Sequence, residues 1–247
     1  FMLRSRIVSE ARKFLDGEGY VEVETPVLQS KAGGALARPF ITHHHALDED
    51  LYLRIALELS LKKLIVGGID RVYEMGRVFR NEGISIRHNP EFTLMECYRA
   101  YADYEDMMDL TERLFSTAAQ AVLGSTKVEF RGQLIELAPP WRRLSLRDAV
   151  KEASGIDFED YPEAGPLYER MLQAGVHVEG APGRGRLIDE LISTFVEPKL
   201  VQPTFLLAYP VEMSPFPKKK RGNPRMVERF EGFICGLEFA NAFTELN

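Results

Sequence analysis

The residues best suited to chemistry lie in a polar segment between two apolar runs, the first ending at Phe79 and the second opening at Phe92. Arg80 and Glu82 stand at the end of the first run. Because side chains on a strand alternate between faces, we expect Arg80 and Glu82 to share one face. A guanidinium binds phosphate oxygens, and carboxylates bind amino groups. This segment therefore predicts a nucleotide site.

The returning strand carries the other half of this hairpin. Phe92, Glu96 and Tyr98 are separated by even numbers of residues, so we expect them on one strand face. If that face lies on the same side as Arg80, an aromatic ring for stacking on a base joins the charged groups. From spacing alone, a charged edge hairpin with surface ion pairs is the alternative.

Apolar periodicity and turn residues predict the elements that position these groups. Helices are expected near residues 1–16, 56–66, 103–122 and 187–195; strands near 21–24, 71–80, 92–99 and 204–208; and hairpins at 128–137 and from 230 onward. Hairpins imply antiparallel pairing. We therefore expect an α+β fold in which helices pack against a mainly antiparallel sheet.

Composition sets the class of protein but not its chemistry. The 247 residues, 45% of them hydrophobic, carry a net charge of −6 and two cysteines. This balance is typical of a cytoplasmic globular protein, and it predicts no broad nucleic-acid surface. No apolar run is long enough for a membrane span. We expect one domain over residues 1–247, with a variable, insertion-like region at about 125–185.

Several long segments resemble class II aminoacyl-tRNA synthetases in their lysyl form. Motif 2 of that family is similar to FRNEGISIRHNPEFTLMECYRAYADY, and its lysine-pocket region to GGALARPFITHHHALDEDLYLRIALELSLKKLIVGG. Motif 1 resembles RSRIVSEARKFLDGEGYVEVETPVL, in which Pro26 is the terminal proline. The strands before motif 3 resemble YPVEMSPFPKK and ERFEGFICGLEFANAFTELN. The similarity runs over essentially the whole chain and implies the class II catalytic fold.

The resemblance implies a site for ATP and Mg²⁺. Its catalytic residue is Arg80, which would bridge the amino acid's carboxylate and the α-phosphate of ATP. The ATP-binding residues implied are Arg80, Glu82, His88, Asn89, Phe92, Glu231 and Glu238. Of these, Glu231 and Glu238 would hold Mg²⁺, since carboxylates on adjacent strands can share a hard cation. Without the resemblance, they would be two unrelated surface glutamates.

The resemblance also implies a lysine site. Its members would be Gly34, Glu58, Arg80, Glu96, Tyr98, Asn241, Phe243 and Glu245. Glu245 and Tyr98 would hold the ε-ammonium group, and the α-amino end would meet Gly34, Glu58 and the Glu96 region. Strand alternation places Asn241, Phe243 and Glu245 on one face. Amino-acid specificity would depend on Glu245, because a buried carboxylate rejects analogues that lack the ammonium group.

The implied function is activation of L-lysine to lysyl-adenylate and its transfer to the 3′ end of tRNA(Lys). A homodimer through residues 1–26 and a cytoplasmic location are also implied. The family's anticodon-binding barrel is expected before residue 1, and its glycine-rich motif 3 after Asn247. We therefore expect the 247 residues alone to bind ATP weakly. Leu237 stands where arginine is expected in many relatives.

Three alternatives remain open at the sequence level. A paralogue of the family transfers lysine or β-lysine to a translation elongation factor. A synthetase-like binding protein would keep the fold without turnover. Aspartyl- and asparaginyl-tRNA synthetases share the fold, but the assignment of Glu245 to an ammonium group opposes them. Lys218–Arg221, a basic run beside prolines, is interpreted as a solvated loop, with contact to the tRNA acceptor end as the other option.

Overall fold

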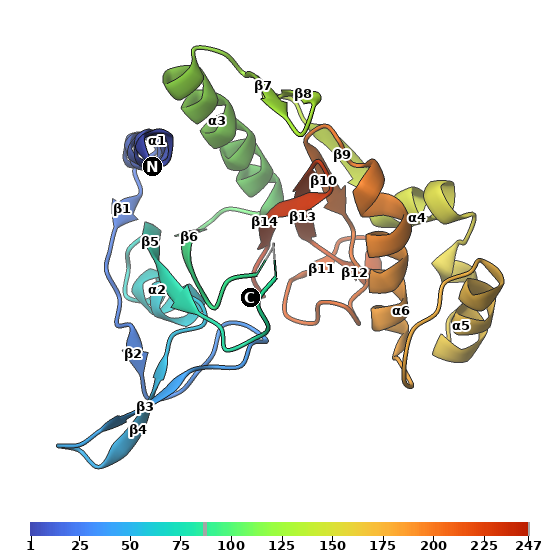
Figure 1. Cartoon of the computed structure of the whole chain (residues 1–247), viewed down its shortest axis with the longest axis horizontal. Coiled ribbons are helices and arrows are strands. Elements are labelled where there is room, and N and C mark those ends of the chain that lie inside the picture. The colour runs from blue at the N-terminus through green and yellow to red at the C-terminus, as the bar shows by residue number, and fades with distance from the viewer. Residues whose placement is uncertain (86–87, 247) are drawn as a thin grey trace. The chain divides into compact units, whose positions relative to one another are not determined.

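The structure is a computed structural model that describes residues 1–85 and 88–246. It forms two compact units (Figure 1). The larger unit comprises Phe1–Glu10 and Ala102–Asn247, and the smaller unit comprises Ala11–Tyr101. Helix α1 (Met2–Gly17) contributes residues to both. Each unit has its own sheets and its own share of buried apolar side chains.

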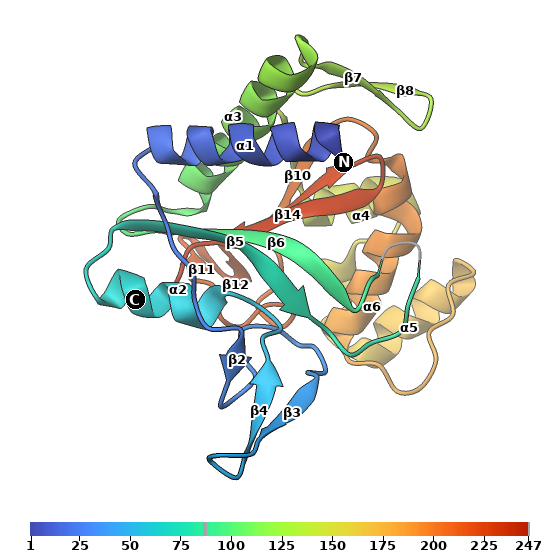
Figure 2. The same ribbon diagram turned by 60° about the vertical axis from the view of Figure 1, so that its left-hand side comes forward.

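The smaller unit is built on a three-stranded sheet in the order β1-β5-β6. Its elements are β1 (Val21–Glu22), β2 (Leu28–Gln29), β3 (Ile41–His44), β4 (Glu49–Leu53), α2 (Glu58–Val66), β5 (Arg71–Phe79) and β6 (Glu91–Arg99). β1 runs parallel to β5, and β5 pairs with β6 in antiparallel register from Arg71↔Arg99 to Phe79↔Glu91. Helix α2 lies against this sheet (Figure 2), where Leu61 packs with Val72.

The larger unit is a four-stranded sheet between helices, in the order β14-β13-β10-β9. Its helices are α3 (Tyr104–Leu123), α4 (Leu146–Ser154), η1 (Phe158–Asp160), α5 (Ala164–Gln173), α6 (Arg184–Leu191), η2 (Ile192–Val196) and η3 (Glu197–Lys199). Its strands are β7 (Lys127–Phe130), β8 (Gln133–Glu136), β9 (Arg142–Ser145), β10 (Thr204–Leu207), β11 (Lys219–Lys220), β12 (Asn223–Val227), β13 (Arg229–Ile234) and β14 (Leu237–Phe243).

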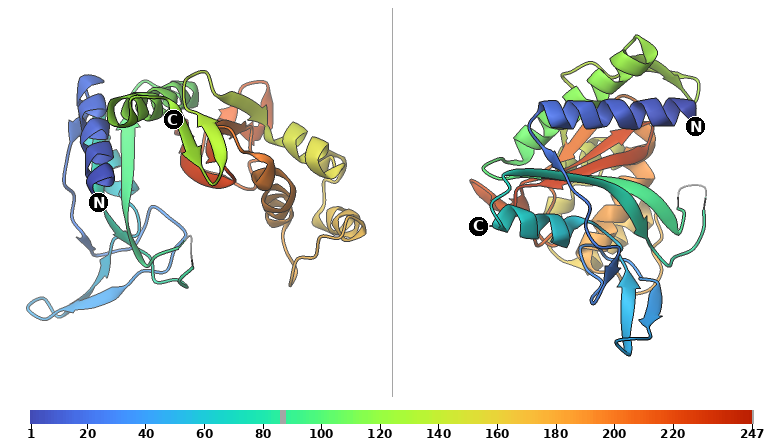
Figure 3. Two further views of the ribbon diagram at one scale, coloured as in Figure 1. Left: turned by 45° about the horizontal axis from the view of Figure 1, so that its top comes forward. Right: turned by 90° about the vertical axis from the view of Figure 1, so that its left-hand side faces the viewer.

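Alternating strand residues build two cores on the two faces of this sheet. Phe205 and Phe230 pack with residues of α3 on one face. Leu206 and Phe233 belong to the core on the other face, together with buried residues of α4, α5 and α6. The ribbons of residues 146–191, yellow to orange in Figure 3, lie on one side of the red strands. The register couples the strands, with β10 antiparallel to β13 and parallel to β9. The sheet is therefore covered on both faces, and this packing fixes the positions of β13 and β14 within the larger unit.

The α+β class is confirmed, with mainly antiparallel sheets and helices packed against them. Helix α3 has the strongest local signals: the Asp103 side chain accepts from the N–H groups of Glu105 and Asp106, and Gly124 ends the helix at φ 74°. The structure also contains strands that periodicity did not predict, β3 and β4 among them. Their faces are largely exposed or half-buried, so no apolar alternation marks them.

The glycine- and proline-rich stretch at 150–184 is a packed part of the larger unit. It contains α5 and η1, and it contributes Phe158, Leu167 and Met171 as fully buried side chains. Among the described residues, no helix combines the length and apolar character that a bilayer crossing requires.

Candidate active site

Arg80 lies directly after β5 and is held by both its backbone and its side chain. Its N–H donates to the carbonyl of Pro90 at 2.8 Å, which closes the hairpin where the strands end. Its Nε donates to the carbonyl of Ile55 at 3.3 Å. The guanidinium carbon lies 5.2 Å from the centre of the Phe92 ring. The structure thus brings the predicted catalytic cation and the predicted stacking ring together, with the guanidinium partly exposed.

A buried ion pair supports the segment that holds Arg80. The Nη1 atom of Arg54 lies 2.6 Å from Oε1 of Glu74, and both side chains are 4% exposed. Arg54 also donates from Nη1 to the carbonyl of Thr25 at 2.9 Å and from Nε to the carbonyl of Arg77 at 2.8 Å. The second carboxylate oxygen of Glu74 accepts from the Thr25 hydroxyl at 2.6 Å. The network is satisfied at both charges, as burial requires.

This network acts on the site through the backbone. The carbonyl of Arg54 accepts from Phe79 N at 2.9 Å, and the next carbonyl, that of Ile55, accepts from Arg80. Arg54 is therefore a positioning residue that sequence reasoning missed. The available signal was an arginine inside the apolar run LYLRIAL, because an isolated charge in such a run must find a buried partner.

Glu82 does not share a strand face with Arg80, which corrects the sequence expectation. β5 ends at Phe79, and the chain turns so that Glu82 N donates to Arg80 O at 2.9 Å. Strand alternation therefore does not apply to this pair.

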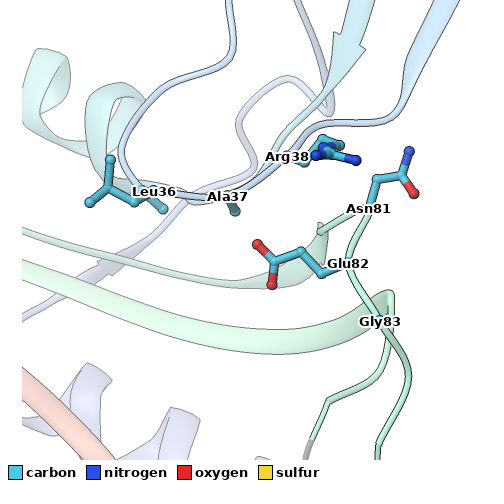
Figure 4. A pocket seen from close by; sticks show the side chains of 7 residues that line it. Leu36, Ala37, Arg38, Asn81, Glu82 and Gly83 are labelled. Atoms are coloured by element: carbon cyan, nitrogen blue, oxygen red, sulfur yellow. The ribbon is translucent and has the colours of Figure 1, made fainter. Parts of the chain in front are cut away.

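Glu82 instead borders an open pocket of about 720 Å³. The pocket is lined by Ala35, Leu36, Ala37, Arg38, Asn81, Glu82 and Gly83. Figure 4 shows the Glu82 carboxylate directed toward the loop that carries Ala37 and Arg38. Asn81 N donates to Arg38 O at 2.7 Å, so the two sides of the pocket are hydrogen-bonded.

His88 and Asn89 lie in the exposed loop between β5 and β6. The Nδ1 atom of His88 lies 2.8 Å from the Ser85 hydroxyl, which fixes the ring locally. Two residues of this loop, Ile86 and Arg87, fall outside the described part of the chain. His88 and Asn89 therefore lie near the hairpin tip, and in the described part of the chain no hydrogen bond joins either of them to Arg80.

Five of the eight predicted lysine-site residues lie in the smaller unit, and Glu96 is at the centre of their contacts. Glu96 accepts from Leu57 N at 2.9 Å with Oε1 and from the Tyr98 hydroxyl at 2.9 Å with Oε2. Burial raises the pKa of Glu96, and the nearby Glu58 carboxylate raises it further, while Arg80 opposes the shift. Glu58 itself pairs with Lys62 at 2.7 Å. The sequence-predicted residues are therefore close enough to interact electrostatically.

Gly34 has a steric reason to be glycine. Its φ is +88°, and a Cβ placed there would lie 3.1 Å from Ala56 Cβ and 3.2 Å from Glu58 Cβ. Any side chain would therefore be strained and would press on Glu58. This close approach shows that Gly34 and Glu58 lie next to each other.

In the larger unit, a β-bulge brings the other acidic residues onto one face. Glu231 pairs with Asn241 across β13 and β14, and Phe233 pairs with Glu238. Between these pairs the register shifts, and the pairing passes from Ala240 directly to Glu238. Without the extra residue, positions 238 and 241 would face opposite sides, because side chains alternate. The bulge therefore places Glu238 and Asn241 on the face of Glu231.

Phe239 is the residue that the bulge sets apart. Its ring covers Gly232, whose added Cβ would lie only 2.8 Å from Phe239 Cζ. Phe239 also contacts Phe115, at a ring-centre distance of 4.8 Å. Gly232 leaves the space that this ring occupies.

Glu231 is held by two neighbours that sequence reasoning did not assign. The Tyr209 hydroxyl donates to Glu231 Oε2 at 2.7 Å, and Arg229 Nη2 bonds to Oε1. Arg229 also donates from Nε to Asn241 Oδ1 at 3.1 Å, and its guanidinium carbon lies 4.6 Å from the centre of the Tyr209 ring. Burial raises the pKa of Tyr209, and Glu231 adds to this shift, so the hydroxyl keeps its proton.

The Glu238 carboxylate is destabilised by burial and by a neighbouring negative charge, and a bound cation would stabilise it. Burial of its carboxyl, followed by the Glu231 charge, raises the pKa of Glu238 to about 7. Glu238 is exposed when all its atoms are considered together. Protein atoms around its carboxyl group nevertheless reduce hydration there, so the Glu231 charge is only weakly screened and raises the pKa of Glu238. Arg229 opposes the shift only in part.

The paired carboxylates suit a hard divalent cation. Among the described residues no group of three or more acidic, histidine or cysteine side chains could form a complete metal cage. Mg²⁺ in nucleotide enzymes is bound through one or two carboxylates together with substrate phosphates. Glu231 and Glu238 lie on one strand face, and the raised pKa of Glu238 reflects the nearby Glu231 charge, so the pair fits that donor set. Tyr209 and Arg229 both contact the Glu231 carboxylate and would share it with the ion.

Glu245 lies beyond the end of β14, which ends at Phe243. An isolated antiparallel bridge to Pro217 extends the pairing to this point, and Glu245 is exposed. Asn241 and Phe243 are on the strand and share a face, as expected. The strand-face argument does not reach Glu245, since two residues beyond the strand the regular alternation has ended.

The comparisons with known proteins cover the full chain. The family model of class II tRNA synthetases (D, K and N) matches residues 1–247. A lysine–tRNA ligase of Enterococcus faecalis is 57% identical, one of Dehalococcoides mccartyi 56%, and one of Moorella thermoacetica 54%. Each similarity covers 247 residues, which is 100% of this chain and 50% of the relative. The chain thus spans about half the length of these curated relatives.

Proposed function

The chain belongs to the class II tRNA synthetases of the D, K and N group, and from this we propose that it activates L-lysine with ATP and transfers it to tRNA(Lys). The observation that carries the proposal is the guanidinium of Arg80, which is partly exposed, stacked on Phe92 and fixed by the Ile55 carbonyl. The lysine–tRNA ligases at 54–57% identity support lysine as the amino acid.

The proposed first step is an in-line displacement at the α-phosphorus of ATP. An oxygen of the lysine carboxylate forms the new P–O bond, the bond to the bridging oxygen breaks, and pyrophosphate leaves with its electron pair. Lysyl-adenylate remains. No base is needed, because the carboxylate is already ionised. Arg80 would hold the carboxylate and the phosphate together through its forked donors and would stabilise the charge that gathers in the transition state.

The remaining residues bind and orient. Phe92 would stack on adenine, with Glu82, His88 and Asn89 around the nucleotide. When bound at Glu231 and Glu238, Mg²⁺ would neutralise phosphate charge and favour departure of pyrophosphate. In the second step the terminal ribose hydroxyl of tRNA attacks the adenylate's carbonyl carbon, and AMP leaves.

The lysine site is proposed to recognise both ends of the amino acid. Glu245 and Tyr98 would hold the ε-ammonium group, with Asn241 and Phe243 beside it. Gly34, Glu58 and Glu96 would receive the α-amino end. The charges of Glu58 and Arg80 both act on Glu96, so the three groups lie close together. The carboxylates would attract the α-ammonium group of an amino acid, and Arg80 would attract its α-carboxylate.

The proposal includes a homodimer and a cytoplasmic location. Phe1, Met2, Leu3 and Ile7 expose apolar surface at the start of the chain, where a second copy would cover it. Both cysteines are free thiols, which is consistent with a reducing compartment.

The nature of the acceptor tests this proposal against its nearest alternative. The full-length protein is incubated with ATP and labelled lysine, then offered tRNA(Lys) or a translation elongation factor. We expect label only in the tRNA fraction, where it should be released by mild alkali as an ester. Label in the elongation factor would replace tRNA charging with protein modification. Adenylate formation with transfer to neither acceptor would contradict both.

A further inference from the structure

The β11–β12 hairpin presents a cluster of basic side chains on the larger unit. Lys219 and Arg221 are exposed, Lys220 is half-buried, and Gly222 makes the turn at φ +82°. Within the described part of the chain, none of these three cations lies within 4.0 Å of a carboxylate in any ion pair found. Arg225, on the returning strand, differs because it pairs with Glu159 at 2.7 Å. We call residues 216–227 the basic hairpin.

An exposed aromatic ring stands at the start of the basic hairpin. Phe216 is 74% exposed, although most phenylalanines of the larger unit's cores are fully buried. A ring exposed to this extent costs hydration free energy in the isolated protein. Next to cations, such a ring is the usual platform for an unpaired nucleotide, since bases stack on the ring while the cations follow the phosphates.

The backbone fixes the base of the hairpin beside Glu245. Pro217 forms an antiparallel bridge with Glu245, and Lys218 N donates to Thr244 O at 2.8 Å. Two further bonds, Thr244 N to Glu228 O at 2.9 Å and Glu228 N to Lys218 O at 2.8 Å, join the three segments. The cations and the ring are therefore held at a set place relative to the residue that is proposed to bind the ε-ammonium of lysine.

We propose that the basic hairpin binds the single-stranded 3′ end of tRNA, with Phe216 stacking on a base and with Lys219, Lys220 and Arg221 contacting phosphates. This inference rests on the proposed function, because the ribose that accepts lysine must come within one lysine length of Glu245. Electrostatics supports it: the chain carries a net charge of −6, so an approaching polyanion is attracted only where cations gather locally.

The test compares two hairpins of the same unit. The β7–β8 hairpin also carries exposed Lys127 and Arg131 around Phe130, which is 40% exposed, with the Arg131 guanidinium carbon 5.3 Å from the ring centre. It has no bridge to Glu245 in the described structure. The double variant Lys219→Ala, Arg221→Ala therefore has a matched control in Lys127→Ala, Arg131→Ala, and Phe216→Ala has one in Phe130→Ala.

Binding of full-length protein to tRNA(Lys) is measured over a range of KCl concentrations, with intact tRNA and with tRNA that lacks its unpaired 3′ nucleotides. For intact tRNA, we expect the Lys219→Ala, Arg221→Ala variant to raise Kd about 3- to 30-fold and to lower the slope of log K against log salt by about 1.4, the value for two lost phosphate contacts. Phe216→Ala should also weaken binding of intact tRNA. For truncated tRNA, these variants should have the same Kd as the wild type.

Three results would overturn the inference. If the hairpin variants lose the same affinity for intact and for truncated tRNA, the contact lies elsewhere on the RNA. If the hairpin variants lose no more affinity for intact tRNA than the β7–β8 control variants do, the effect is a general one of net charge. A raised KM for ATP in lysine-dependent ATP–pyrophosphate exchange, with unchanged tRNA binding, would assign the cations to nucleotide phosphates. If the wild type lacks exchange with lysine, the proposed function fails, whereas the comparison of intact with truncated tRNA still decides the role of the hairpin.

Discussion

Arg80 and Glu245 carry different parts of the proposed reaction, and the chain supports them differently. Arg80 is fixed by backbone and side-chain contacts, which suits a group whose position must not change as charge develops. Glu245 is exposed and lies at an isolated backbone bridge to Pro217, which leaves its carboxylate accessible to an incoming amino acid.

Glu245→Gln keeps the size of the side chain and removes its charge. Loss of a charge-assisted hydrogen bond to the ε-ammonium group should raise the KM for lysine about 10- to 100-fold. Because the nucleotide is not bound by this residue, the KM for ATP should stay near the wild-type value. ATP–pyrophosphate exchange at varied lysine measures both constants. Glu152→Gln, an exposed glutamate on α4, is the matched control. An unchanged KM for lysine would remove Glu245 from the site.

At the scale of elements, the β-bulge in β14 decides which side chains can act together. Glu238 and Asn241 are three residues apart, a spacing that places them on opposite faces of a regular strand. The bulge reverses this and brings both to Glu231. Strand alternation in the sequence correctly placed Asn241 and Phe243 on one face. It did not predict that Glu238 shares the face of Glu231, because this depends on the register shift where Phe239 packs over Gly232.

Gly232→Ala tests the bulge directly. The new methyl group would meet the Phe239 ring at 2.8 Å, so the ring or the strand must shift. We expect a loss of about 1–3 kcal/mol in the free energy of unfolding, which is typical of an overpacked core. Urea denaturation measures the change. Gly165→Ala in α5, where an added Cβ meets nothing within 4 Å, is the control and should be neutral or slightly stabilising. Equal stability of the Gly232 variant and the wild type would contradict the packing argument.

A second element-scale prediction concerns the junction of α4 and η1. Asp157 is 6% exposed and bonds Arg147 through both carboxylate oxygens at 2.8 Å, with Lys151 at 3.1 Å. These bonds, Arg147 first, hold the pKa of Asp157 well below its usual range. A depressed folded-state pKa contributes stability above the unfolded value of 3.8, and that stability is lost as pH falls below it.

Asp157→Asn should therefore cost about 1–3 kcal/mol of unfolding free energy at pH 7, and the difference from wild type should shrink as pH falls below about 4. Thermal unfolding at pH 7, 5 and 3 gives the profile. Asp160→Asn, an exposed aspartate in the same η1 turn, should be near neutral at every pH. A cost for Asp157→Asn that does not change with pH would point to packing rather than charge.

At the scale of the whole molecule, the apolar start of the chain predicts a dimer. Ile7 on α1 is 44% exposed, beside the more exposed Met2 and Leu3. In sedimentation of the full-length protein at micromolar concentration, we expect a dimer that Ile7→Glu shifts toward monomer. Leu172→Glu on α5, where the leucine is 45% exposed, is the matched control and should leave the assembly unchanged. A monomeric wild type would contradict this prediction.

Much of the architecture was predictable because its signals are local. The caps of α3, the turn at Arg131 and Gly132, and the apolar stripes of β5 and β6 all appear as expected. Three features depend on contacts remote in sequence: the Arg54–Glu74 pair, the Tyr209–Glu231 bond, and the turn that removes Glu82 from the strand. No periodicity encodes such contacts, so the residues that support the site were harder to find than its members.

Activation of lysine is the step on which the whole proposed function depends. The most direct test is ATP–pyrophosphate exchange by the full-length protein, with each of the twenty amino acids offered separately. We expect exchange with lysine alone, a loss of more than about 100-fold in kcat/KM on Arg80→Ala, and little change on Arg77→Ala, an exposed arginine of β5. Exchange with aspartate or asparagine, or lysine-dependent exchange that survives Arg80→Ala, would contradict the proposed function.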